Sequence, residues 1–291
     1  MKLLGLFTFL LFGHFSTSDA VMADETKWDQ ATWLWHTSNI VEAPDEVLQF
    51  LNQKDVDSVY LQINRDIEPT SYMSFIKEAT NDGISVYALD GSKNWISNRE
   101  GFDLFLNWVE KYQNFAADGE KFSGIHLDVE PYLHEMWDND YQNAILQYQN
   151  IISEAAQKAE QWDMLFAADI PFWYDTKYFD NETYGKGLLH KWVIDTSDEV
   201  GIMAYRNFAE GSNGIIEISK NEIQYAKEVG KKVTVGVETK EITSYDYISF
   251  YGLGEEKMNE EVTKVYDQFG SITSFNGFAI HSYKYWKALG K

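Results

Sequence analysis

Apolar residues follow two different spacings along the chain. Eight short runs are continuously apolar or alternate apolar with polar residues, and the stretches between them repeat apolar residues every three or four positions. The first spacing is typical of β-strands and the second of amphipathic helices. The predicted strands cover residues 32–37, 57–64, 84–90, 124–130, 164–171, 200–206, 232–238 and 277–283.

Helical spacing fills most of the intervals between the predicted strands. Pro44 stands at a first-turn position, and Gly230 and Gly270 follow the ends of two helical stretches, as is typical of helix boundaries. The segment 174–197 is less regular and predicts a loop with a helix near 187–194. The other predicted helices cover residues 43–52, 102–115, 141–159, 218–229 and 258–269.

Strict alternation of eight strands with helices predicts an α/β fold, a (β/α)8 TIM barrel that forms a single domain over residues 24–291. Such barrels typically take about 250 residues. The main alternative is a doubly wound open sheet. Against it, TWLWHTSN stands where a glycine-rich phosphate loop would follow the first strand.

The fourth predicted strand, GIHLDVEP, alternates apolar with ionisable side chains. In a closed barrel, alternate residues face the helices and the lumen. The apolar half of the run suits the helix side, so His126, Asp128 and Glu130 are expected to face inward. Each inward charge alone is costly in a low-dielectric interior, so several together indicate a site or a compensating network.

The same rule places polar side chains inward near the carboxyl ends of the other strands. This is the face on which barrel enzymes carry their active sites. The further residues expected there are Gln62, Asn64, Asp169, Tyr205, Glu238, His281 and Tyr283, with Arg65 at the rim.

Residues 123–130, SGIHLDVE, resemble the fourth-strand signature DxxDxDxE of family 18 chitinases and related glycosidases. The resemblance implies that Glu130 is the general acid and that Asp128 orients the substrate's N-acetyl group, which is the nucleophile in that family. The segment 203–205, MAY, is similar to the family's sixth-strand Met-x-Tyr-Asp, and implies that Tyr205 helps to stabilise the intermediate. The positions that depart from the family's acids are Ser123, His126 and Arg206.

A second resemblance implies a direct nucleophile. Retaining glycosidases on (β/α)8 barrels place an acid/base Glu after strand four and a nucleophilic Glu after strand seven, and Glu130 and Glu238 are similar to that pair. Arg65 and Tyr205 resemble the Arg and Tyr that often accompany it, whereas Val129 replaces the usual Asn. Both resemblances make Glu130 the proton donor. The direct scheme requires carboxyl groups about 5–5.5 Å apart.

Aromatic residues are dense in the segments that follow the strands. Sugar rings stack on aromatic planes, so Trp95, Trp137 and Trp173 are predicted platforms for a carbohydrate, with loop packing as the alternative. The other predicted substrate contacts are Asn64, Arg65, His126, Asp169, Arg206, His281 and Tyr283.

Residues 1–23, MKLLGLFTFLLFGHFSTSDAVMA, read as a secretory signal peptide with cleavage after Ala20 or Ala23. Their apolar run is too short for the roughly 30 Å of a bilayer core, so no stable membrane insertion is expected. The absence of Cys excludes disulfides, and the net charge of −22 disfavours nucleic acid and anionic membranes as partners. A neutral or cationic glycan suits this charge better than a polyanionic one.

Together these features predict a secreted, extracellular glycoside hydrolase that retains configuration and needs neither metal nor cofactor. Its substrate is an oligo- or polysaccharide, and its oligomeric state is left open. One alternative is a non-catalytic glycan-binding barrel. The other is a metal-dependent hydrolase that uses His126, Asp128 and Glu130, with His281 completing the site.

Overall fold

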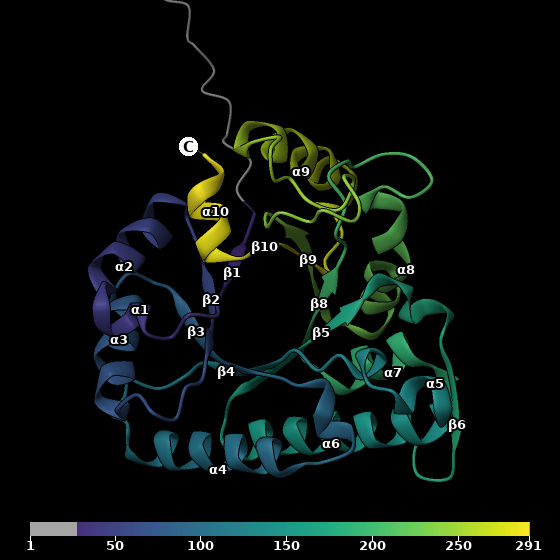
Figure 1. Cartoon of the computed structure of the whole chain (residues 1–291), viewed down its shortest axis with the longest axis horizontal. Coiled ribbons are helices and arrows are strands. Elements are labelled where there is room, and N and C mark those ends of the chain that lie inside the picture. Colours follow the sequence, from purple (N-terminus) through teal and green to yellow (C-terminus); the bar gives the residue numbers. More distant parts are fainter. Residues whose placement is uncertain (1–27, 291) are drawn as a thin grey trace, which may run out of the picture.

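The computed structural model describes residues 28–290, which form a closed barrel of eight parallel strands surrounded by helices (Figure 1). The barrel order is β1-β10-β9-β8-β5-β4-β3-β2. The strands are β1 (Gln30–Leu34), β2 (Ser58–Gln62), β3 (Ser85–Asp90), β4 (Gly124–Leu127), β5 (Leu165–Pro171), β8 (Glu199–Met203), β9 (Lys232–Glu238) and β10 (Phe275–His281). The TIM-barrel prediction is confirmed. The doubly wound alternative is wrong because β1 pairs with both β2 and β10.

Helices connect the strands and cover the outside of the barrel (Figure 1). The principal ones are α1 (Asn39–Glu42), α2 (Pro44–Gln53), α3 (Pro69–Asn81), α4 (Glu100–Phe115), α6 (Tyr141–Gln161), α7 (Leu189–Thr196), α8 (Ile215–Val229), α9 (Glu255–Phe269) and α10 (Tyr283–Leu289). Shorter elements after the strands are η1 (Lys93–Ile96), η2 (Pro131–Leu133), α5 (Met136–Asn139) and η3 (Phe172–Thr176). None of the helices within residues 28–290 is long and apolar enough to span a bilayer. The predicted signal peptide, residues 1–23, lies outside the described residues.

The segment predicted as a loop with a helix contains a feature that the sequence did not indicate. An antiparallel hairpin of β6 (Tyr178–Asn181) and β7 (Gly185–Leu188) precedes α7. Most of its residues are exposed or half-buried, so its sequence lacks the apolar alternation that marks a strand. Gly185 has φ +75°, a conformation that suits glycine at the turn.

The core has two layers, one between the barrel and the helices and one inside the barrel. Side chains of β4 and the residues after it point alternately into the two layers. Ile125, Leu127 and Val129 are buried between barrel and helices, which confirms their expected direction. Inside the barrel, aromatic side chains fill the lumen, so that it is a packed core and not a pore. This inner cluster consists of Ala31, Trp33, Tyr60, Tyr87, Leu89 and Ala279.

Glycines on the inner face of the strands make room for the large and polar side chains of the lumen. A Cβ atom on Gly201 would collide with the Oδ1 of Asp169, and one on Gly124 would collide with the ring of Tyr87. These strands therefore accept bulky neighbours only because they carry glycine there.

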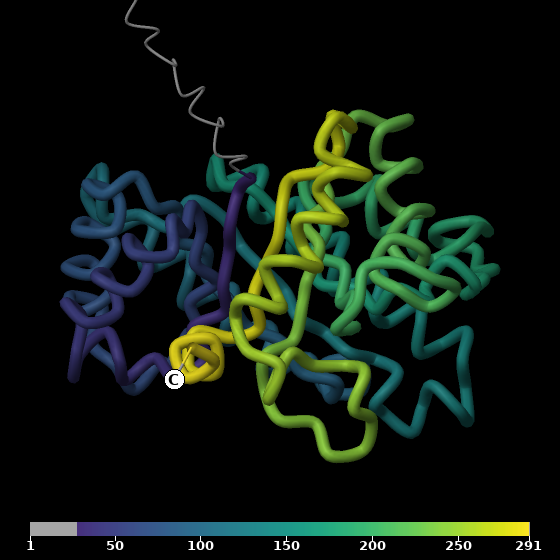
Figure 2. The backbone as a smooth tube through the Cα atoms, turned by 90° about the horizontal axis from the view of Figure 1, so that it is seen from above, coloured from purple at the N-terminus to yellow at the C-terminus, as the bar shows by residue number. Residues whose placement is uncertain are grey.

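The connection from β9 to α9 projects from one end of the molecule as a long loop, close to α10 (Figure 2). Its backbone is tied to the barrel where Phe250 N donates to the carbonyl of Glu238 at 2.9 Å. This end carries the carboxyl ends of the strands.

Candidate functional site

A cavity of about 450 Å³ opens at the carboxyl end of the barrel. Residues that follow five different strands line it, among them Trp35, Asp128, Glu130, Lys240 and His281. A neighbouring hollow of about 560 Å³ shares Trp35 as part of its wall. Of the residues expected to face inward from the fourth strand, Asp128 and Glu130 therefore line a cavity, at the carboxyl end of the barrel.

Glu130 follows β4 and is half-buried at the cavity. The hydroxyl of Tyr132, from the short helix η2, donates a hydrogen bond to its Oε1. Burial, together with the charge of Glu130, raises the pKa of the Tyr132 phenol, which keeps the phenol protonated as a donor. Glu130 thus presents one held oxygen and one oxygen without a side-chain partner among residues 28–290.

Asp128 lies one pleat before Glu130 and also lines the cavity. Burial, followed by the nearby charges of Asp169 and Glu130, raises its pKa well above the ordinary value. Its Oδ1 is buried and has no hydrogen-bond partner within the described part of the chain. Asp128 therefore brings to the cavity a carboxyl group with an unused hydrogen-bond acceptor among the described residues.

His126 and Asp169 lie deeper, beneath Asp128. His126 is fully buried and stacks on Tyr60 with a ring separation of 3.8 Å, and its Nε2 lies 2.8 Å from Asp169 Oδ2. Trp33 Nε1 donates to the same oxygen at 3.0 Å. Neither side chain is among those that line the cavity. The expected substrate contacts of His126 and Asp169 are therefore corrected: both side chains are buried in the lumen and have a supporting role there.

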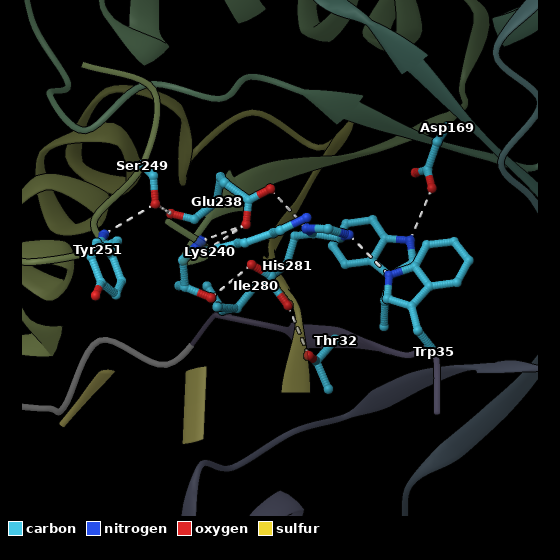
Figure 3. Close-up of polar contacts among 11 residues, drawn as sticks. Thr32, Trp35, Asp169, Glu238, Lys240, Ser249, Tyr251, Ile280 and His281 are labelled. Carbon is cyan, nitrogen blue, oxygen red and sulfur yellow. Dashed lines mark hydrogen bonds and ion pairs between the residues drawn. The ribbon is translucent and has the colours of Figure 1, made fainter. Parts of the chain in front are cut away.

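Glu238 ends β9 and is 4% exposed. Its Oε1 accepts hydrogen bonds from the backbone nitrogens of Thr239 and Lys240, at 2.8 and 2.7 Å. Its Oε2 lies 2.9 Å from Nδ1 of His281, and Nε2 of His281 lies 2.9 Å from Nε1 of Trp35 (Figure 3). Both oxygens of Glu238 are thus occupied, whereas the cavity wall is formed by His281 and Trp35.

Tyr205 and Arg206, which follow β8, differ in their surroundings. Tyr205 lies beside His281, with ring centroids 5.8 Å apart, and burial together with the charge of Glu238 raises its pKa. Arg206 is buried and donates to the carbonyl of Tyr205 at 2.7 Å and to Asn213 at 2.9 Å. The expected substrate contact of Arg206 is corrected, because these bonds use the guanidinium to fix the loop.

Arg65 and Asn64 belong to the neighbouring hollow. Nη1 of Arg65 lies 3.9 Å from Oδ2 of Asp90, and the Asn64 side chain accepts a hydrogen bond from Asp66 N at 3.0 Å. Their contact with substrate remains a prediction, and it requires a ligand that extends past Trp35.

The predicted aromatic platforms divide into two kinds. Trp95 is 5% exposed and packs on Phe102 and Phe105 of α4, so the stacking role expected for it is wrong. Trp137 and Trp173 are half-buried in one aromatic cluster around Tyr174, and both stay predictions.

Tyr283 also differs from its expected direction. The strand β10 ends at His281, and Tyr283 begins α10, where its ring packs on Phe50 with centroids 5.1 Å apart. It still borders the cavity, but the ring is held in the layer between barrel and helices.

Two residues of the site escaped the sequence analysis. Trp35 lies on the same face of the first strand segment as Trp33, so the alternation of TWLWHT contained the signal. Tyr132 could not be predicted, since nothing in a local pattern indicates a hydrogen bond back to Glu130 two residues earlier.

The residues proposed for a metal-dependent alternative are engaged elsewhere. His126 pairs with Asp169, His281 with Glu238, and Glu130 with Tyr132. Over residues 28–290, no group of three or more His, Cys, Asp or Glu side chains is arranged to hold a metal ion. This alternative therefore has no geometric support.

Comparison with known proteins gives matches to solved structures only. No family model and no curated protein matches the sequence. A GH18 chitinase from Pseudoalteromonas aurantia is similar over 89% of this chain and 98% of its own, with 14% identity and a TM-score of 0.55. A plant class V chitinase mutant from Cycas revoluta, in complex with (GlcNAc)3, is similar over 89% and 96%, with 12% identity and a TM-score of 0.53.

The spore cortex-lytic enzyme SleL from Bacillus cereus is similar over 90% of this chain and 73% of its own, with 13% identity and a TM-score of 0.53. At such identities the likeness establishes a shared fold. It confirms, at that level, the expected resemblance to family 18 chitinases.

Proposed function

We propose that this protein is a secreted glycoside hydrolase that cleaves N-acetylated glycans with retention of configuration. The observation that carries the proposal is the joint exposure of Asp128 and Glu130 to one cavity at the carboxyl end of the barrel. Solved structures that share the fold include chitinases and a cortex-lytic enzyme, one of them in complex with (GlcNAc)3. That kinship supports a glycan as the substrate class.

Glu130 is the general acid in this proposal. Cleavage of a glycosidic bond needs a proton on the leaving oxygen while the C1–O bond breaks. The Oε1 of Glu130 is held by Tyr132, so its other oxygen is the one that delivers the proton. After departure of the leaving sugar, the Glu130 carboxylate accepts a proton from water as that water attacks C1.

The nucleophile in this proposal is the substrate's own acetamido oxygen. It attacks C1 as the leaving group departs, and the positive charge then moves onto the acetamido nitrogen. Asp128, with its unpartnered Oδ1, orients the amide and accepts its N–H hydrogen bond. The negative form of Asp128 stabilises that developing charge, so catalysis requires loss of the proton that its raised pKa retains.

A direct attack by Glu238 is the competing scheme. Glu238 accepts two backbone hydrogen bonds and lies 2.9 Å from His281, and it is absent from the cavity wall. A carboxylate stabilised by three hydrogen bonds is a poorer nucleophile than a free one. These contacts favour the substrate-assisted scheme.

A comparison of matched substrates tests this function. N-acetylated chitooligosaccharides are expected to be cleaved, whereas their fully deacetylated counterparts of the same length are expected to bind without turnover. An Asp128→Asn variant is expected to lose about 10²–10⁴ in kcat on the acetylated substrate. Equal cleavage of both substrates would contradict the acetamido step and restore the Glu238 scheme.

A non-catalytic glycan-binding barrel is the second candidate. It is favoured by Ser123 and His126, which stand in place of two acids in the fourth-strand signature. Binding of acetylated glycans without cleavage of any of them would establish that function instead.

A further inference from the structure

Three side chains from three neighbouring strand ends form a continuous series of contacts (Figure 3). Two of them, His281 and Trp35, line the cavity. Glu238 comes from β9, His281 from β10 and Trp35 follows β1. The contacts are 2.9 Å between Glu238 Oε2 and His281 Nδ1, and 2.9 Å between His281 Nε2 and Trp35 Nε1.

The chemistry of these groups fixes the direction of both hydrogen bonds. An indole N–H is a donor only, so Nε2 of His281 must accept the bond from Trp35 and carries no proton. The proton of the neutral ring is therefore on Nδ1, which donates it to Glu238. Glu238 therefore accepts at both oxygens, from His281 at one and from the backbone nitrogens of Thr239 and Lys240 at the other.

Aromatic packing holds the imidazole in this orientation. The rings of Trp33, Trp35 and Tyr205 surround His281, with centroid separations of 5.3, 6.0 and 5.8 Å. His281 consequently has little freedom to rotate away from either hydrogen-bond partner.

Of Glu238, His281 and Trp35, Trp35 alone lines both hollows of the site, and its neighbour His36 also lines both. Trp33, on β1 two positions earlier, is 2% exposed and fills the barrel, whereas Trp35 follows the strand and is half-buried. Trp35 therefore lies where the cavity of Asp128 and Glu130 meets the hollow of Arg65, along which an extended glycan would pass.

We propose that Glu238 and His281 are positioning residues that hold Trp35 as the sugar-stacking wall of the site. The proposal rests on the proposed function for the identity of the ligand. Glu238 sets the tautomer of His281, His281 fixes the indole N–H, and the fixed ring face receives a sugar. Glu238 thus acts on the substrate through two other side chains and not by attack on it.

A Glu238→Gln substitution tests the tautomer because it changes one atom. The Gln oxygen keeps the two backbone bonds, so its NH2 group faces His281 and forces the imidazole proton onto Nε2. Two donors then face each other at Trp35, and that hydrogen bond is lost. Nitrogen NMR of labelled His281 is expected to show protonated Nδ1 in the wild type and protonated Nε2 in the variant. An unchanged tautomer would contradict the proposal that Glu238 orients Trp35 through His281.

Two replacements of His281 form a matched pair. His281→Gln places an acceptor oxygen near the position of Nε2 and can keep the bond from Trp35, whereas His281→Asn reaches only Glu238. If the Trp35 contact matters, His281→Gln retains affinity for (GlcNAc)3 and His281→Asn loses it. Equal affinities of the two variants would overturn the positioning role. Thermal melts of both variants identify any that fail to fold.

Affinity for (GlcNAc)3 is measured in a Glu130→Gln background, which prevents turnover, by quenching of tryptophan fluorescence. Trp35→Ala is expected to abolish most of the quenching, and Glu238→Gln to weaken binding about 5- to 20-fold. In the otherwise wild-type enzyme, Glu238→Gln is expected to raise KM while kcat changes less than about 3-fold. A collapse of kcat by about 10³ or more would instead make Glu238 the nucleophile.

The outcomes separate this inference from the function on which it rests. Turnover of acetylated glycans that is indifferent to Trp35→Ala would overturn the inference and leave the function standing. Failure of the wild type to bind (GlcNAc)3 would overturn the stacking role of Trp35 and the proposed function together. The NMR result would then test only the hydrogen bonds that link Glu238, His281 and Trp35.

Discussion

At the scale of single residues, the site depends on a few polar side chains, Asp128, His126 and Asp169, that lie close together in a barrel otherwise filled largely by aromatic rings. Asp169 accepts a hydrogen bond from Trp33 and lies 2.8 Å from His126. After burial, the charge of Asp169 contributes most to raising the pKa of Asp128. The chain thus uses a carboxylate from β5 to tune a carboxyl group that follows β4.

Removal of the Asp169 charge is expected to shift the pH profile. Asp169→Asn lowers the pKa of Asp128, because a nearby negative charge no longer opposes its ionisation. The proposed mechanism needs ionised Asp128, so the acidic limb of kcat/KM against pH should move to lower pH. Asp90→Asn is the control, since Asp90 is a half-buried carboxyl whose charge is not among those that raise the pKa of Asp128. A shift to higher pH, or none, would contradict this role.

Sequence alone could identify part of this site. Alternation along the fourth strand predicted that Asp128 and Glu130 face inward, and both line the cavity, because the strand period is two and the barrel has only two faces. The same rule could not say how deep each inward residue lies. His126 faces inward as expected, yet it lies below the cavity because depth depends on barrel geometry and not on periodicity.

At the scale of elements, the eight strands were predictable because each has a buried face with strong apolar patterning. The helix α3 was not identified, and neither was α10 with its early start at Tyr283. The role of Trp95 was mistaken for a different reason. Its segment follows a strand as a site loop would, but its ring is covered by α4, a contact that no local pattern encodes.

Truncation of Trp95 is therefore expected to affect stability and not binding. Trp95→Ala should lower the free energy of unfolding by about 3–5 kcal/mol, the usual cost of removing a large buried aromatic side chain. Chemical denaturation measures this, with Trp137→Ala as a half-buried comparison. Loss of (GlcNAc)3 binding at unchanged stability would show that Trp95 is a platform after all.

The helix α8 carries a buried acid that makes stability depend on pH. Glu222 is fully buried, and both of its carboxyl oxygens lack hydrogen-bond partners within residues 28–290. Burial raises its pKa from 4.5 to about 8. The unfolded chain ionises near the lower value and the folded chain near the higher one, so stability falls as pH rises between them.

Glu222→Gln removes this dependence. The variant should gain roughly 1–3 kcal/mol over the wild type at pH values above about 8, and the two should be similar at strongly acidic pH. Melting curves across this interval measure the difference, and Glu217→Gln, exposed on the same helix, is the control. A constant difference at all pH values would contradict a pKa effect.

At the scale of the whole molecule, a large core has to hold a chain with no Cys and a net charge of −22. Self-repulsion at such a charge disfavours the compact state and must be offset by burial in the two core layers. The same charge disfavours anionic partners, so we expect the proposed substrate to be a neutral or cationic glycan.

Export is expected to remove the first segment of the chain. Mass spectrometry of the protein recovered outside the cell should give a chain that begins at Val21 or Asp24, after cleavage at Ala20 or Ala23. Ala20→Leu and Ala23→Leu variants would show which site is used. An external protein that still begins at Met1 would contradict the signal-peptide assignment.

The central claim is that Glu130 is the proton donor of a glycosidase, and one paired measurement tests it most directly. Wild-type protein and Glu130→Gln are incubated with the same broad panel of glycans, and both binding and cleavage are recorded. The wild type is expected to cleave at least one N-acetylated glycan, and Glu130→Gln to bind that glycan with similar affinity while turnover falls by about 10²–10⁴. Equal turnover by the two proteins, or binding without cleavage by the wild type, would contradict the account.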